Sequence, residues 1–291
     1  MSKLEIMPTV LGGDGGNFES FAHDVRNATS PHFFITEDHK YGALRRFIPS
    51  KVNWSDPSTM LYDKNGKFDY LVLVPDWNGR RDHDNGYPEC GTYYWTEQKE
   101  EAEASAYSCK LSDSCKDQSS TLLQMNINRA NLHLESSTPH KYFLSSTVYR
   151  YTEGIDIAGN SMYVMSKEFR RMFTIDLDSN QYCSESSMHG SFYGGQDQVI
   201  KLLDDDAEAA LYFTEEGAYG GIHGRMTDGR YFTILEGTVE GEETTGLAFS
   251  PDNKHMYFAF QEEGRLMDVT RKDGLPFSGQ EVNIKYHYMP K

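Results

Sequence analysis

Short apolar stretches alternate with turn residues along this chain. Residues 243–260 show the arrangement most clearly: an acid, a β-forming stretch, the turn Ser250-Pro251-Asp252-Asn253-Lys254, and a second β-forming stretch. Proline presets φ, and aspartate and asparagine tolerate left-handed backbone, so the middle of this run predicts a tight turn. The flanking stretches, 245–249 and 256–260, are rich in residues that favour strands. The run therefore predicts a β-hairpin.

The same arrangement recurs, and an acid leads each strand-like stretch at Glu19, Glu153, Asp197 and Glu243. The last three acids lie about 45 residues apart, and the first interval is about three times as long, a period typical of β-propellers. Four short strands and their turns fill such a length. We therefore predict an all-β fold, a single β-propeller domain over residues 1–291. Six blades fit the period best, two of them between residues 50 and 150. Five blades are the alternative, and a β-sandwich is the rival architecture.

Residues 97–140 interrupt the pattern, because they are charged, rich in serine and contain two cysteines. We expect an insertion or surface excursion there. The chain has four cysteines, Cys90, Cys109, Cys115 and Cys183, whose spacing matches no zinc ribbon. Two disulfides are expected, and three pairings stay open.

The composition limits the classes of partner that the chain is expected to bind. The 291 residues carry a formal net charge of −16, which repels nucleic acid and anionic membranes and attracts cations. No apolar run reaches the ~18 residues of a membrane span, so none is expected. The first residues lack the apolar core of a signal peptide, so the chain is either intracellular or has lost a leader. Tripeptides at Asn27 and Asn53 that would accept N-glycans favour a secreted, periplasmic or extracellular location. We also expect the protein to be a monomer.

The repeated acids carry the candidate chemistry. The first strand of each propeller blade lines the central channel, so acids at the start of these strands would meet at one mouth. Converging carboxylates raise one another's pKa unless a cation lies between them, and calcium accepts such oxygen ligands in flexible geometry. The metal-ligand candidates are Glu19, Glu37, Glu153, Asp197, Glu215, Glu216 and Glu243. The alternative interpretation of each single acid is a solvated side chain.

Several motifs are missing from the sequence. It contains no Gly-x-Ser-x-Gly, no phosphate-binding Gly-rich loop with lysine, and no His-Glu-x-x-His. Hydrolysis by this chain would therefore depend on a metal that polarises the phosphoryl or acyl oxygen and activates water.

Five segments together resemble the PhoX-type alkaline phosphatase family, in particular its shorter algal and bacterial members. They are Thr36-Glu37-Asp38-His39, Glu153-Gly154-Ile155-Asp156, Gln196-Asp197-Gln198-Val199, Tyr212-Phe213-Thr214-Glu215-Glu216 and the run from Glu243 to Asp252. The resemblance implies a six-bladed propeller whose axial site holds calcium, with iron or another transition metal beside it, and which cleaves phosphate monoesters. It makes Glu37, Glu153, Asp197, Glu215 and Glu243 metal ligands. The chain has no cysteine near Glu37, where longer members place an iron-bridging thiolate, so calcium transfers better than iron.

Three functions follow as hypotheses. The first is a calcium-dependent phosphoester hydrolase for a small phosphorylated molecule, in which Lys167, His223 and Arg225 are the catalytic candidates that hold the phosphate. The second is a non-catalytic propeller that calcium stabilises and that acts as a binding or scaffold module. The third is a metal-dependent lactonase or esterase.

Overall fold

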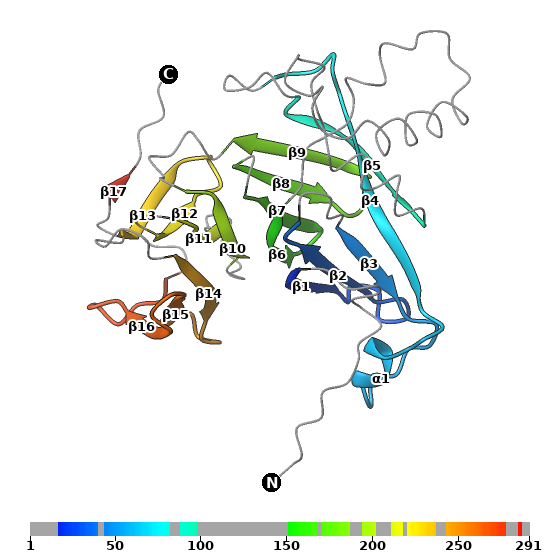
Figure 1. The fold of residues 1–291 in the computed structure, drawn as a ribbon, viewed down its shortest axis with the longest axis horizontal. Coiled ribbons are helices and arrows are strands. Elements are labelled where there is room, and N and C mark those ends of the chain that lie inside the picture. The colour runs from blue at the N-terminus through cyan, green and yellow to red at the C-terminus, as the bar shows by residue number, and fades with distance from the viewer. Residues whose placement is uncertain are drawn as a thin grey trace.

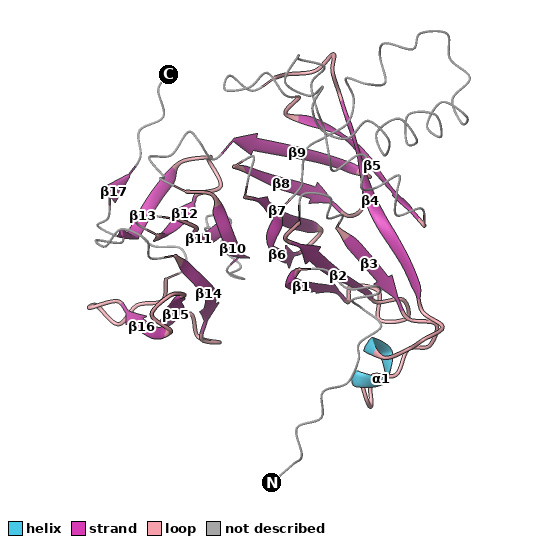
Figure 2. Ribbon diagram, in the orientation of Figure 1, coloured by secondary structure: helices cyan, strands magenta, loops and turns pink. Residues whose placement is uncertain are grey.

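Strands make up almost all of the regular secondary structure in the described part of the chain. The computed structural model describes residues 17–39, 44–81, 88–97, 151–167, 170–186, 194–201, 211–217, 220–236, 243–277 and 285–286. One helix of 4 residues, α1 (Ser58–Leu61), lies among these strands (Figure 2). No helix in these ranges is long and apolar enough to cross a membrane. The insertion expected at 97–140 lies outside them, apart from its first residue.

The strands form four antiparallel units that follow one another along the chain (Figure 1). Unit 1 comprises β1 (Phe18–Asp24), β2 (His32–Glu37), β3 (Arg45–Ile48) and β4 (Lys67–Pro75). Unit 2 comprises β6 (Thr152–Ala158), β7 (Ser161–Ser166), β8 (Arg171–Asp176) and β9 (Gln181–Ser186). Unit 3 comprises β10 (Gln196–Lys201), β11 (Leu211–Glu215), β12 (Gly221–Arg225) and β13 (Tyr231–Glu236), and β17 (Lys285–Tyr286) pairs with its last strand. Unit 4 comprises β14 (Thr244–Phe249), β15 (His255–Phe260) and β16 (Arg265–Thr270).

The first strand of each unit lies innermost, and the following strands pair outward from it (Figure 1). Strand β6 lies between β1 and β10, and β10 lies between β6 and β14. Apolar side chains fill the space between neighbouring units, so that Phe34 and Phe173 share one cluster, Met165 and Phe213 a second. Because each cluster takes residues from two units, the units stabilise one another around a common centre.

The predicted hairpin is present as β14 and β15. Asn253 in its turn has φ 55°, the left-handed conformation that asparagine tolerates. The Ser250 hydroxyl donates to Asp252 at 2.6 Å and accepts from the His255 backbone N–H at 3.0 Å. These local hydrogen bonds close the turn and set the pairing of the two strands.

The prediction that residues 50–150 contain two separate blades falls largely on residues 98–150, which lie outside the described residues. Strand β4 pairs with β3, and β5 (Cys90–Thr96) pairs with β4, so these strands extend unit 1 outward instead of beginning a new unit. Strand β5 also pairs with β9, which joins units 1 and 2 in one nine-stranded sheet. A repeat period cannot reveal such outward pairing, because it depends on which strand edge is free. The number of blades, six or five, stays a prediction, since the described residues contain four units.

One disulfide crosses the junction of units 1 and 2. Cys90 of β5 lies opposite Cys183 of β9, and the two sulfurs are bonded. This selects a partner for Cys90 that spacing left open, while Cys109 and Cys115 lie outside the described residues.

We predict that replacing both Cys90 and Cys183 by serine lowers the free energy of unfolding by about 2–5 kcal/mol, because the bond closes a loop across 93 residues. Denaturant titration of the double variant and the unchanged protein measures the difference. An unchanged unfolding midpoint would contradict a stabilising role for the bond.

Candidate metal centre

The inner strands share a local irregularity that places side chains at one end of each unit. The pairing register shifts after Phe18 in β1, after Thr152 in β6 and after Gln196 in β10. A bulge of this kind turns a side chain out of the regular alternation. The next residue in each strand is an acid, and these three acids are Glu19, Glu153 and Asp197. The same device therefore presents a carboxyl group in three units.

A second set of equivalent positions follows the second strand of each unit. The residues directly after β2, β7 and β11 are Asp38, Lys167 and Glu216. The Lys167 ammonium lies 2.6 Å from a carboxylate oxygen of Glu153 and 3.2 Å from both Asp38 and Glu216. One cation thus contacts carboxylates from three units.

The two sets meet in one group, which we call the acidic cluster. Its members are Glu19, Asp38, Glu153, Lys167, Asp197, Glu216 and Glu243. One carboxylate oxygen from each of Glu19, Asp38 and Glu153 lies within 4.8 Å of the other two. The Glu243 carboxyl interacts electrostatically with Asp197 and Glu216, which places it beside the same group. Six carboxyl groups therefore surround one ammonium.

Burial and mutual repulsion raise the pKa of Glu19, Glu153, Asp197, Glu216 and Glu243. Burial raises the pKa of Glu153 to about 9, against the opposing effect of Lys167. Burial, and then the nearby Asp197 and Glu216 carboxylates, raise the pKa of Glu243 to about 7. The pKa values of Asp197 and Glu216 are also raised, mainly by burial, and that of Glu19 by partial burial and the charges of Asp197 and Asp38. The cluster holds more negative charge than its one lysine compensates.

The pKa of the Lys167 ammonium is also raised. Burial lowers this pKa, but the hydrogen bond and charge of Glu153, together with the charges of Glu216 and Asp38, more than offset this and hold the pKa above its ordinary value. The lysine therefore stays charged and acts as the cation of the cluster in this state.

Two of the predicted ligands, Glu37 and Glu215, point away from the cluster into buried pairs of their own. Glu37 accepts a hydrogen bond from Arg45 at 2.9 Å, and both side chains are almost fully buried. Glu215 contacts the His223 imidazole at 2.8 Å and accepts from the Gly194 backbone N–H at 2.6 Å. The two acids occupy equivalent positions, as the last residues of β2 and β11, so the same buried pairing appears in units 1 and 3.

The three predicted phosphate-binding residues are separated. Lys167 lies in the acidic cluster, whereas His223 is buried between Glu215 and the Thr233 hydroxyl, 2.9 Å away. Arg225 lies at the end of β12 that pairs with the start of β11, away from Glu215, and there it contacts Glu185. The geometry therefore brings one of the three to the cluster.

In unit 4 the acid does not lie at the position that the residue spacing predicts. Thr244 pairs with Phe260 as Phe18 pairs with Glu37, so the position equivalent to Glu19 is Thr245 and not Glu243. The Thr245 side chain hydrogen-bonds the Asp197 carboxyl group. Glu243, the residue directly before β14, reaches the cluster from there. The evenly spaced acids therefore occupy two different structural positions: one within the first strand of a unit, and one just before it in unit 4.

Asp38 is the member that sequence reasoning missed. The pair Glu37-Asp38 matches Glu215-Glu216 in the third unit, and in each pair the second acid belongs to the cluster. Comparison of the two pairs was the available signal, because neighbouring residues of a strand end face different sides.

No protein family model matches the chain, and no curated protein matches it. The structure is similar to Pseudomonas fluorescens PhoX in complex with vanadate, a transition state analogue, with a TM-score of 0.58 and 14% identity over 92% of this chain and 55% of that chain. The chain has the β-propeller fold. It spans about half the length of PhoX.

A second structure is regucalcin, a calcium-binding protein from Agrobacterium tumefaciens. The identity is 16%, over 45% of this chain and 58% of that chain, and the TM-score of 0.24 is too low to bear on the architecture. The propeller fold, with its four described units, accounts for the convergence of the acids.

The adjacent acids Glu37 and Asp38 should respond in opposite ways to amidation. We predict that Glu37→Gln lowers the free energy of unfolding by about 3 kcal/mol, because the buried Arg45 loses its carboxylate partner. Asp38→Asn should instead leave stability nearly unchanged and weaken divalent-cation binding. Denaturation curves and cation titrations of both variants check this. Equal loss of cation affinity in the two variants would contradict the assignment of Asp38 to the cluster.

The metal-free propeller should lose stability as the pH rises from 7 to 9. A carboxyl group whose pKa is higher folded than unfolded makes the folded state hold more protons, so the free energy of unfolding falls on deprotonation. The pKa of Glu153, about 9, predicts a fall of up to about 1.4 kcal/mol per pH unit in this range. Melting temperatures in chelator measure it, and Glu153→Gln is the control that should flatten the profile. A wild-type profile that rises or stays flat would contradict the prediction.

Proposed function

We propose that the acidic cluster binds a divalent cation, calcium, and that the protein uses it to hydrolyse a small phosphoester. The carrying observation is that ligand oxygens of Glu19, Asp38 and Glu153, from two units, lie within 4.8 Å of one another. Carboxylates held this close and partly out of water repel unless a cation compensates them.

The chemistry of the donor set favours calcium. The members of the acidic cluster offer carboxylate oxygens and one ammonium, and none of them is a histidine or a cysteine. Hard cations such as calcium take oxygen ligands in flexible geometry, while softer transition metals favour nitrogen and sulfur. Glu19, Asp38 and Glu153 would hold the ion, with Asp197, Glu216 and Glu243 beside it.

The residues around such an ion support phosphoester hydrolysis. Bound calcium would supply Lewis-acid polarisation of a phosphoryl oxygen. The Lys167 side chain is 22% exposed, and its ammonium is the charged donor at the cluster for a substrate phosphate. Glu243, whose pKa is raised to about 7, suits proton exchange with water or the leaving group near neutral pH. The structural similarity to PhoX, solved with vanadate, adds support for this choice of reaction.

A second candidate function is a calcium-stabilised propeller without catalysis. Its support is the placement of His223 and Arg225, which contact Glu215 and Glu185 and leave Lys167 as the one predicted phosphate-binding residue at the cluster. A secreted or periplasmic location fits both candidates, because disulfides such as Cys90–Cys183 persist mainly in oxidising compartments.

Metal analysis combined with an activity assay tests the proposal. The purified protein should contain calcium that EGTA removes, and p-nitrophenyl phosphate should be hydrolysed with calcium present and not after chelation. Calcium binding without turnover would favour the non-catalytic candidate. A protein that binds no calcium would overturn both candidates.

Lys167 should affect the two steps differently. We predict that Lys167→Gln raises calcium affinity roughly tenfold, since the ammonium no longer competes for the same carboxylates, and lowers phosphoester hydrolysis, since the phosphate loses its charged donor. Lys254→Gln, the same charge change on the exposed turn of unit 4, is the matched control and should change neither. Undiminished hydrolysis in Lys167→Gln would exclude this lysine from phosphate binding.

A further inference from the structure

A cavity of ≈ 360 Å³ lies at the opposite end of the strands from the acidic cluster. Asp24 and His32 face each other where β1 ends and β2 begins, whereas Phe18 and Glu37 pair at the cluster end. The turn between β8 and β9 contributes Asp178 to the cavity wall, which also contains Asp24 and His32. No member of the acidic cluster lines this cavity, so it is a separate candidate site.

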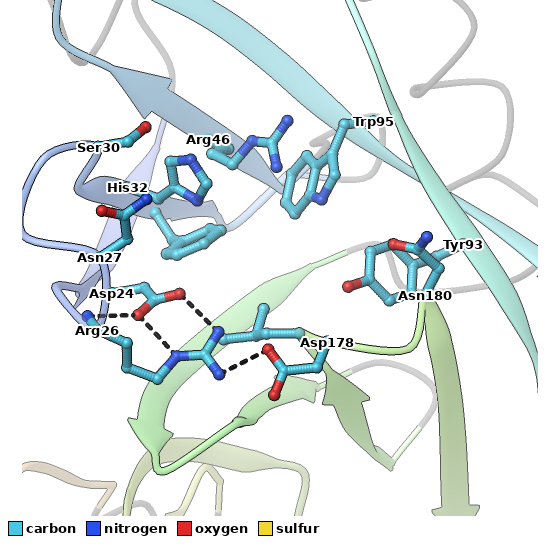
Figure 3. A pocket seen from close by; sticks show the side chains of 12 residues that line it. Asp24, Arg26, Asn27, Ser30, His32, Arg46, Tyr93, Trp95, Asp178 and Asn180 are labelled. Carbon is cyan, nitrogen blue, oxygen red and sulfur yellow. Dashed lines mark hydrogen bonds and ion pairs between the residues drawn. The ribbon is translucent and has the colours of Figure 1, made fainter.

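Carboxylates already match the positive charge in the cavity wall, and Figure 3 shows the two that contact Arg26. The Arg26 guanidinium donates to Asp24 and to Asp178, each at 2.9 Å. Arg46 donates to Asp69 at 2.5 Å and lies over the Trp95 ring, 4.4 Å from its centroid. Each of the two guanidinium groups therefore has a carboxylate partner, and an anionic ligand would find no unmatched cation among the lining residues.

Aromatic rings form an apolar part of the wall. Trp95 lies 5.7 Å from Phe34 and 6.3 Å from Tyr93, measured between ring centroids. Tyr93 is held in place because its hydroxyl donates to the Asp176 carbonyl at 2.9 Å. Phe34 and Tyr93 are 1% and 5% exposed, so the partly buried Trp95 supplies most of the apolar contact area that a ligand can reach.

Uncharged hydrogen-bonding groups complete the lining. Burial, and then the charge of Arg46, lower the pKa of His32, so its imidazole is neutral and offers one donor and one acceptor. Ser30 adds a hydroxyl and Asn180 an amide, and none of these three side chains makes a hydrogen bond within the described residues. Figure 3 shows the Asn180 amide beside Tyr93.

We propose that this cavity binds a neutral sugar ring. A pyranose has an apolar C–H face, which suits the aromatic wall, and a rim of hydroxyl groups, which suit paired donors and acceptors such as imidazole, hydroxyl and amide. The volume falls at the small end of the range of about 300–1,000 Å³ for small-molecule sites. The matched charges favour an uncharged ligand over a sugar phosphate.

Saturation-transfer NMR and titration with the methyl glycosides of glucose, galactose, mannose and N-acetylglucosamine test the proposal. At least one should show saturable binding with the strongest transfer at its C–H face. EGTA should leave this binding unchanged, because the acidic cluster does not line the cavity. No saturable binding by any of the four, or tighter binding of glucose 6-phosphate than of methyl glucoside, would overturn the proposal.

Two asparagine variants provide a matched pair. Asn180 and Asn253 both have φ 55°, which glycine adopts readily, so Asn→Gly removes the amide at each position with little effect on the backbone. Asn180→Gly should weaken glycoside binding roughly fivefold, the loss expected for one hydrogen bond. Asn253→Gly, in the turn of unit 4, should not change it. Equal affinities of the two variants would contradict a role for Asn180.

Discussion

The candidate site depends on the repulsion among carboxyl groups that the propeller brings to one end of its inner strands. Six acids from four units surround the single ammonium of Lys167, whose closest partner is Glu153 at 2.6 Å. The bulges in β1, β6 and β10 present Glu19, Glu153 and Asp197 to this group, and the apolar contacts between units hold them there against repulsion. In the function that we propose, an added cation would relieve this repulsion.

Glu37 and Glu215 have different structural roles from the acids that directly follow them in the sequence. Glu37 and Glu215 form buried pairs with Arg45 and His223 from the next strand, and the residues that follow them belong to the acidic cluster. The pairs tie the second strand to the third at the point where the cluster begins. Local structure and cation binding are thus supported by different side chains of the same two-residue motif, so either can change without the other.

Units 1 and 2 carry the two candidate sites at opposite ends of their strands. Strand β5 and the Cys90–Cys183 bond join these units at their outer edge, and the cluster that contains Phe34 and Phe173 joins them inside. This double connection makes the pair a rigid support. At one end excess negative charge favours a metal ion, while at the other end Arg26 and Arg46 are matched by carboxylates and favour an uncharged ligand.

The sequence by itself determined the strand-forming stretches, the turn at Asn253, the β-propeller class and the convergence of Glu19, Glu153 and Asp197, because these follow from local preferences and a period. It did not reveal that Glu37 faces Arg45, that Asp38 joins the cluster, or that Thr245 occupies the position expected for an acid. Only the tertiary structure decided these points. Side-chain direction at a strand end depends on the register with the neighbouring strand, and a single bulge, invisible in a residue count, reverses it.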